Sequence, residues 1–194
     1  EWEVSKKSGI LITFDDGYFN NLERALPIHT ALNVPVTLFT TTHWLQNQEG
    51  FWWELAYQPN NANLAYNDVI KQLMPLPLLS EKFEVLAGLG IENVLPLADE
   101  NRPMTLDELK IFASSNLVNI GSHTTTHPRL ALLSKEMQMN EMQTSKQFLE
   151  EELGKKVELI SYPHGGKTAF NQITKIVAEE AGYSHGFAAY SGSI

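Results

Sequence analysis

The sequence predicts an α/β fold built on a parallel sheet. Short apolar runs that are typical of buried strands alternate with longer segments that carry helix start and stop signals. This alternation favours strands joined by helical crossovers, which makes the strands parallel in either an open sheet or a closed barrel. At 194 residues, with 43% hydrophobic and 19% charged residues, the chain is long enough for one domain, 1–194, with a large core.

Five strands are predicted along the chain. Each is short, apolar or β-branched, and bounded by turn residues, as expected for strands buried in a parallel sheet. They cover 9–14 (GILITF), 34–40 (VPVTLFT), 116–121 (NLVNIG), 156–161 (KVELIS) and 184–189 (SHGFAA).

The helices between them are predicted from their ends. A capping box at Thr105, with Glu108 three residues later, starts a helix that runs to about residue 115. Gly154 stops a long helix over 134–153, and Gly182 stops another over 168–181. A helix over 18–32 has Pro27 inside it, which predicts a kink or a division.

The segment 44–103 interrupts this alternation of strands and helices. It contains the run FWWEL at 51–55, an Asn-rich stretch at 59–63, and prolines at 75 and 77. We interpret it as a mostly helical insertion between the second and third strands. Inserted segments on such scaffolds often shape access of the substrate to the site.

The composition excludes several classes of function. A formal charge of -9 argues against a nucleic-acid partner, because the phosphate backbone would repel it. The absence of cysteine excludes disulfides, thiolate metal sites and a Cys nucleophile. No run approaches the ~18 apolar residues of a transmembrane span, and no signal peptide is visible. The chain opens on Glu1 rather than Met, so we expect a processed or trimmed piece, and the compartment stays open.

Polar residues follow three of the predicted strands directly. Asp15 and Asp16 follow the first strand, His123 and His127 the third, and 162–165 (YPHG) the fourth. The carboxyl ends of parallel strands meet at one edge of the sheet, where ligands collect. We therefore expect these three groups to lie on the same face.

Two histidines and one carboxylate with an open coordination position suit a catalytic divalent metal. The second carboxylate is then a candidate general base beside a metal-bound water. Because neighbouring strand residues point to opposite faces, Asp15 and Asp16 cannot easily share one role. The combination indicates hydrolysis.

Each motif taken alone has a structural explanation. Asp-Asp-Gly is a common turn, and two histidines four residues apart usually lie on a surface or at a cap. Their joint occurrence after separate strands is what favours a site. Trp52 and Trp53 fit either the core of the insertion or a platform for stacking a sugar, and His164 could touch the substrate.

These strings resemble motifs of the polysaccharide deacetylase family, also described as the NodB homology domain or carbohydrate esterase family 4. TFDDG at 13–17 is similar to the family's first motif, HTTTH at 123–127 to its second, H-[S/T]-x-x-H, and SYPHG at 161–165 to a variant of its third. The resemblance runs over nearly the whole chain. The FWWEL run and the helix start at Met104 and Thr105 are similar to bacterial members tied to surface-polysaccharide synthesis, which implies a cell-envelope role in either an envelope-associated or a cytoplasmic setting.

The resemblance implies a distorted (β/α) barrel with a helical insertion after the second strand and a mononuclear divalent metal, zinc above others. Asp15 would be the catalytic base, and the backbone N–H of Tyr162 would help to hold the oxyanion. The metal ligands would be Asp16, His123 and His127, and the substrate-binding residues would be Trp52, His164 and Gly165. The substrate would be an acetylated polysaccharide or oligosaccharide.

Two departures from the family pattern keep other functions open. The third-motif Arg that orients the base has no equivalent near Ile160 or Ser161, and the motif with the catalytic acid His should follow the last strand. We therefore expect the chain to be truncated at its C-terminal end. The sequence favours removal of N-acetyl groups from amino sugars. The alternatives are an O-acetyl or formyl deacylase of a surface-glycan precursor and a non-catalytic glycan-binding module.

Overall fold

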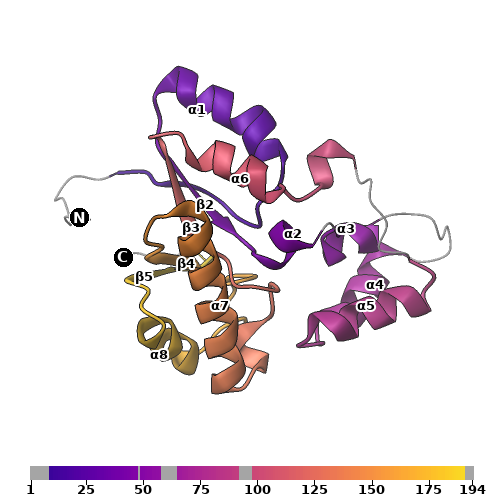
Figure 1. Ribbon diagram of the computed structural model, residues 1–194. Helices are drawn as coiled ribbons and strands as arrows, with labels where there is room; N and C mark the ends of the chain where they lie inside the picture. Colours follow the sequence, from indigo (N-terminus) through magenta and orange to yellow (C-terminus); the bar gives the residue numbers. More distant parts are fainter. Residues whose placement is uncertain (1–8, 48, 58–64, 92–97, 191–194) are drawn as a thin grey trace.

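A parallel sheet of five strands forms the centre of the molecule (Figure 1). The computed structural model describes residues 9–47, 49–57, 65–91 and 98–190. The strands are β1 (Ile12–Phe14), β2 (Val36–Thr40), β3 (Val118–Ser122), β4 (Leu159–Ser161) and β5 (His185–Phe187). They lie in the order β1-β2-β3-β4-β5 and all pairs are parallel, as the sequence predicts.

The sheet curls as part of a barrel. Each strand is the neighbour of the next in sequence, so crossovers of one hand place their helices on one face. On the other face, the rings of Phe39 in β2 and Phe187 in β5 lie 5.0 Å apart, although two strands separate them. Strands spaced about 4.8 Å apart in a flat sheet would hold these rings well over 10 Å apart. The curvature brings them together.

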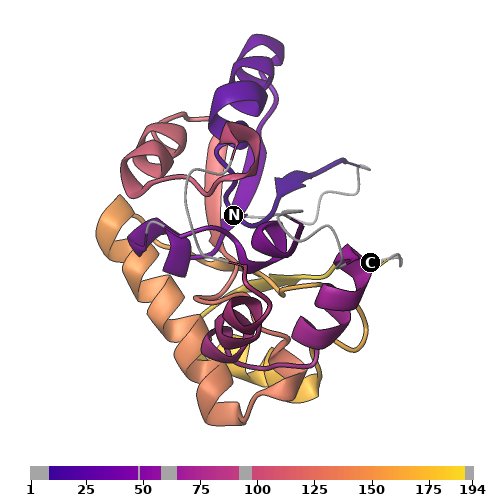
Figure 2. The ribbon, with the colours of Figure 1, turned by 90° about the vertical axis from the view of Figure 1, so that its right-hand side faces the viewer.

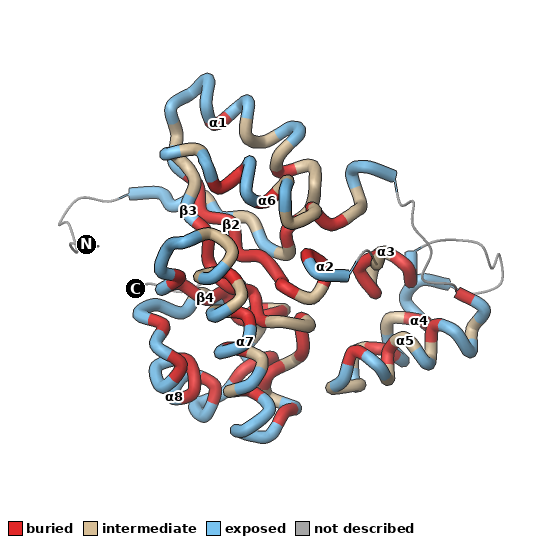
Figure 3. Tube along the Cα trace, in the orientation of Figure 1, coloured by how far each residue is buried: buried red, intermediate tan, exposed pale blue. Residues whose placement is uncertain are grey.

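The helices that cover the outer face bury the main core. They are α6 (Leu106–Ala113), α7 (Lys135–Leu153) and α8 (Gln172–Glu180). Their apolar side chains, among them Leu109, Met142 and Val177, belong to the same buried cluster as Leu38 and Ile120 of the sheet. Figure 3 shows this buried layer between the strands and helices α6 and α7.

The predicted caps are present, and one helix starts later than predicted. Thr105 Oγ1 accepts the N–H of Glu108 (3.2 Å), and the Glu108 carboxylate accepts the N–H of Thr105 (2.8 Å). Gly154 ends α7 in the left-handed conformation. The predicted helix 168–181 was wrong at its start: α8 begins at Gln172, because Asn171 caps it by accepting the N–H of Thr174.

The predicted helix 18–32 is divided. A π-helical turn (Asn21–Ala25) leads directly into α1 (Leu26–Leu32), and Pro27, which has no backbone N–H to donate, lies just after this change of helix type. The last strand is also shorter than 184–189. Its residues lie at the edge of the sheet, where they are exposed or half-buried.

The segment between β2 and β3 has a core of its own. It contains α2 (His43–Gln46), α3 (Trp52–Tyr57), α4 (Tyr66–Leu73), α5 (Leu79–Gly88) and a 3₁₀ turn (Asp99–Asn101). Helices α3, α4 and α5 stand beside the sheet as a separate group (Figures 1 and 2). Apolar side chains from all three form this second core, among them Leu55, Leu73 and Leu86, and Phe51 just before α3 joins them. The predicted Asn-rich stretch 59–63 lies outside the described residues.

Candidate metal centre and active site

The carboxyl ends of β1, β2 and β3 are joined by backbone hydrogen bonds. Thr40 of β2 is in register with Ser122 of β3, and the N–H of His123 donates to the Thr40 carbonyl (2.9 Å). The next residue, Thr41, donates its N–H and its hydroxyl to the Asp16 carbonyl (3.2 and 2.9 Å). The loops that follow β1, β2 and β3 therefore meet at one edge of the sheet.

Three side chains at this edge form a group that could hold a metal ion. One ligand atom from each of Asp16, His123 and His127 lies within 4.8 Å of the others. Asp16 Oδ1 lies 3.5 Å from Nε2 of His123 and 3.4 Å from Nε2 of His127. Both distances exceed the 2.7–3.2 Å that is usual for an N–H···O hydrogen bond. Two ligands bound to one tetrahedral zinc at about 2.0–2.1 Å would be about 3.4 Å apart, so the donor set fits such an ion.

The two imidazoles are held in different ways. Nδ1 of His123 is 2.8 Å from the Ser161 carbonyl and must donate to it, which leaves the Nε2 lone pair free to bind a metal. Nδ1 of His127 is buried and has no hydrogen-bond partner among the described residues. Its ring lies against the rings of Trp53 and His164, at centroid distances of 4.6 and 4.7 Å.

Burial sets the charge states of these groups. It lowers the pKa of His127 well below its ordinary value, assisted by the neighbouring His123, and so keeps the imidazole neutral. Neutral imidazole is the form that binds metals. Burial also raises the pKa of Asp16 to about 6, while the nearby His123 opposes this shift. A bound cation would restore the charged carboxylate.

The two aspartates have different surroundings. Asp16 faces the imidazoles, whereas Asp15 is exposed and close enough to raise the pKa of Asp16 by charge repulsion. Asp15 is outside the ligand group among the described residues.

A cavity of about 240 Å³ opens over the metal group. Five of its eight lining residues come from the segment between β2 and β3, so this segment forms the wall and the metal group forms the floor. The lining residues are Asp16, Trp52, Trp53, Tyr66, Ile70, Met74, His127 and His164. Trp52 and His164, both predicted to bind substrate, thus lie at this cavity.

Gly165 and Tyr162 have other contacts in this structure. A Cβ on Gly165 would overlap the backbone of Ala189, so this glycine serves close packing against 189. The backbone N–H of Tyr162 donates to the Phe187 carbonyl (3.0 Å). It could hold an oxyanion only after this hydrogen bond is given up.

Trp53 is a site residue that the sequence reasoning did not select. Its indole N–H donates to the Tyr18 hydroxyl (2.7 Å), and this hydroxyl donates to Glu54 (2.6 Å). The ring also stacks on Phe51 at 4.7 Å. These contacts fix the indole beside His127. The FWWEL run in the sequence indicated aromatic residues near the site, but it did not show which of Trp52 and Trp53 would lie beside His127.

The structure places none of the arginines, all of which lie in the described part of the chain, as a partner of Asp15, so the family's base-orienting Arg has no replacement from elsewhere in the chain. The chain has three arginines, and each pairs away from Asp15. Arg24 pairs with Glu100, Arg102 with Glu108, and Arg129 with Thr168.

Residues 3–186 match the sequence pattern of the polysaccharide deacetylase family, and the chain belongs to this family. No curated protein matches the chain. Within the described residues, no helix is long and apolar enough to cross a membrane.

Solved structures with a similar fold include deacetylases. A Streptococcus pyogenes deacetylase, PplD, in complex with acetate, has a TM-score of 0.60 and 20% identity over 93% of this chain and 56% of that chain. A de-N-acetylase from Aggregatibacter actinomycetemcomitans has a TM-score of 0.63 and 18% identity over 96% of this chain and 65% of that chain.

A third similar structure is BA3943, described as a CE4 family pseudoenzyme from Bacillus anthracis. It has a TM-score of 0.57 and 16% identity over 94% of this chain and 43% of that chain. At such identities the likeness shows the fold, a distorted (β/α) barrel of the NodB type. The chain spans between about two fifths and two thirds of these solved chains.

Proposed function

We propose that the chain is a metal-dependent hydrolase that removes N-acetyl groups from the amino sugars of a polysaccharide or oligosaccharide. The observation that carries the proposal is the group of Asp16, His123 and His127 at the carboxyl ends of parallel strands, with Asp15 free beside it. Membership in the polysaccharide deacetylase family supports the acetylated glycan as substrate.

The three ligand residues would hold a divalent ion, and zinc suits two imidazoles and one carboxylate best. When bound, this ion polarises the acetyl carbonyl and lowers the pKa of water. Asp15 accepts a proton from the attacking water, and the amide C–N bond breaks as that proton is passed on to the leaving nitrogen, which gives acetate and the free amine of the sugar. The indole of Trp52 and the imidazole of His164 line the cavity in which the sugar is held.

Two alternatives follow from the same residues. The site chemistry also suits hydrolysis of an O-acetyl ester or a formyl amide on a surface-glycan precursor. The missing base-orienting Arg, together with the fold shared with a pseudoenzyme, favours as a second candidate a glycan-binding module without turnover.

The test measures bound zinc and released acetate for the purified chain and two variants. The substrates are an N-acetylglucosamine oligomer and an O-acetylated sugar. Wild type should bind about one zinc per chain and release acetate from the oligomer. Asp15→Asn should keep the zinc and lose acetate release, because only the base is removed, whereas His123→Ala should lose the zinc.

The results separate the candidates. Release from the ester alone would favour the O-deacylase. Binding of the oligomer by the zinc-loaded protein without acetate release would favour the binding module. No bound zinc in wild type would refute the metal site, and loss of zinc in Asp15→Asn would show that the two aspartates have the opposite roles.

A further inference from the structure

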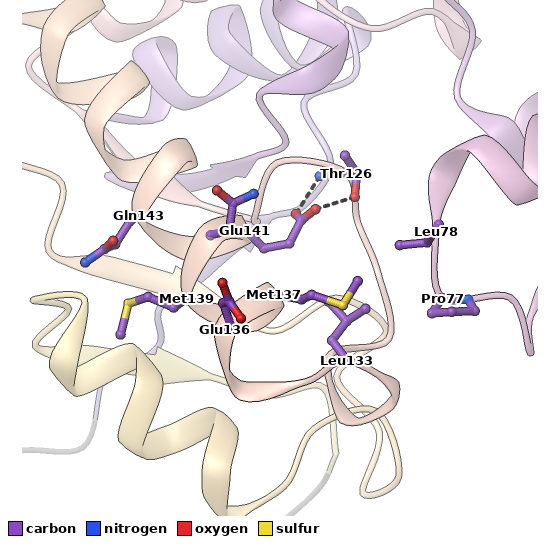
Figure 4. Close-up of a pocket in the computed structure, with 10 residues that line it drawn as sticks. Pro77, Leu78, Thr126, Leu133, Glu136, Met137, Met139, Glu141 and Gln143 are labelled. Carbon is purple, nitrogen blue, oxygen red and sulfur yellow. Dashed lines mark hydrogen bonds between the residues drawn. The ribbon is translucent and has the colours of Figure 1, made fainter.

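The loop between the two histidines is held by a carboxylate from another element. Glu141 lies on α7 and faces the loop, at the edge of a hollow of about 540 Å³ between α7 and the turn at Pro77 and Leu78 (Figure 4). Its Oε2 accepts the backbone N–H groups of Thr125 (2.9 Å) and Thr126 (2.8 Å), and its Oε1 accepts the Thr126 hydroxyl (2.6 Å). Thr125 Oγ1 also donates to the Glu141 carbonyl (3.1 Å).

These bonds hold a strained backbone. Thr124 and His127 have φ values of +67° and +57°, a left-handed conformation that non-glycine residues seldom adopt. Such residues persist where the surroundings over-determine the chain. Glu141 supplies three acceptor contacts to two consecutive residues, and these bonds oppose the rise that burial causes in the pKa of its carboxyl, since they stabilise the charged form.

His127 depends on this loop more than His123 does. The His123 ring is anchored at Nδ1 by the Ser161 carbonyl, whereas Nδ1 of His127 has no partner among the described residues. The direction of the His127 ring is therefore set by its backbone and by ring packing. Its own N–H donates to Thr124 Oγ1 (3.2 Å), inside the loop that Glu141 holds.

We propose that Glu141 is a positioning residue that fixes the Thr125–Thr126 backbone so that the His127 imidazole faces Asp16 in the metal group. This inference rests on the proposed function, since it takes the three ligands as a metal site. Glu141 itself contacts neither the ligand atoms nor the cavity over them. Its effect is on the affinity for the metal.

The test is the affinity for Zn²⁺ alone, measured by competition with a chromogenic chelator, in the whole chain. Glu141→Ala removes all three acceptors, and Glu141→Gln keeps one oxygen that can still accept the two N–H groups. Glu151→Ala is the matched control, because it removes the same charge from an exposed position of the same helix. Loss of a direct hydrogen-bond partner of a metal ligand typically weakens metal affinity 10–100-fold, and Glu141 acts one contact further out, through the loop. We therefore expect a loss of about 10-fold for Glu141→Ala, a smaller one for Glu141→Gln, and none for Glu151→Ala.

Thermal unfolding with and without Zn²⁺ separates positioning from general stability. A purely structural role would lower the midpoint equally in both conditions, whereas a positioning role shrinks the increase that Zn²⁺ produces. If Glu141→Ala does not fold, Glu141→Gln alone decides the matter by the same two measurements. Unchanged affinity and an unchanged Zn²⁺-induced increase in the folded variants would overturn the inference. Failure of wild type to bind Zn²⁺ would overturn the metal site, and this inference with it.

Discussion

Replacement of Gly17 by alanine should disturb both the fold and the metal group. Gly17 has φ +99° and follows Asp16, whose φ is +72°, so two consecutive left-handed residues turn the chain after β1. A Cβ on Gly17 would overlap Thr40 Oγ1 and would lie 3.3 Å from Thr40 Cβ. Thr40 is fully buried in β2, so its side chain has no room to move away.

The magnitude follows from comparison with Gly154→Ala. Gly154 also has positive φ, +62°, but a Cβ there would meet nothing within 4 Å. That variant should lose only the cost of a left-handed L-residue, roughly 1–2 kcal/mol. Gly17→Ala adds an overpacking cost of roughly 1–3 kcal/mol, so its total loss should be about 2–5 kcal/mol. The gain from a stiffer unfolded chain is similar in both variants and cancels in the comparison.

Urea denaturation of both variants measures this difference as a shift in midpoint at unchanged m value. Because Gly17 adjoins Asp16, the variant should also bind Zn²⁺ more weakly, while Gly154→Ala should bind it as wild type does. Equal losses of unfolding free energy in the two variants would refute the steric reasoning. Wild-type zinc affinity in Gly17→Ala would refute the link to the metal group.

Two further predictions concern an ion pair and the cavity wall. Arg102 makes two 2.8 Å hydrogen bonds to Glu108 and so holds the pKa of this carboxyl below its usual value. The contribution of this ion pair to the free energy of unfolding is present above pH 4.5, the ordinary pKa of the carboxyl, and is lost as the pH falls through the lower folded-state pKa. Wild type should therefore lose more unfolding free energy between pH 5 and 3 than Glu108→Gln does. Parallel curves of unfolding free energy against pH would contradict this. Trp53→Leu removes the indole ring that lies against His127. An aromatic contact is worth about 0.5–1.5 kcal/mol, so its loss should lower kcat/KM for acetate release by roughly 3–10-fold. Trp53→Phe should lose less, and an unchanged rate in Trp53→Leu would show that the ring is not part of the substrate wall.

The features that the sequence predicted well depend on neighbouring residues. The caps at Thr105 and Gly154 are correct because a cap is a hydrogen bond or a backbone conformation within a few residues. The inner strands were found because apolar runs there are buried in a parallel sheet, whereas the edge strands β1 and β5 are exposed or half-buried, contrary to the expectation that all five are buried. The meeting of Asp16, His123 and His127 could also be predicted, because parallel pairing brings the carboxyl ends of strands to one edge.

Other features depend on segments that are distant in sequence. Ala169 and Phe170, which were predicted to lie in the helix that Asn171 in fact begins, are instead buried in the main core. The Tyr162 N–H looked available in the sequence but is used by Phe187 of the next strand. Strand pairing of this kind cannot be read from a local pattern.

The sequence by itself determined the family, the parallel α/β architecture and the three residues that meet at the candidate metal site, because these appear as local patterns at the ends of strands. Only the tertiary structure decided that Trp53 packs on His127 and that Glu141 holds the loop between the histidines. The physical reason is that each of these depends on where a side chain points after distant segments have packed. A helix and a loop more than a dozen residues apart are brought into hydrogen-bond range by the shared core beneath them.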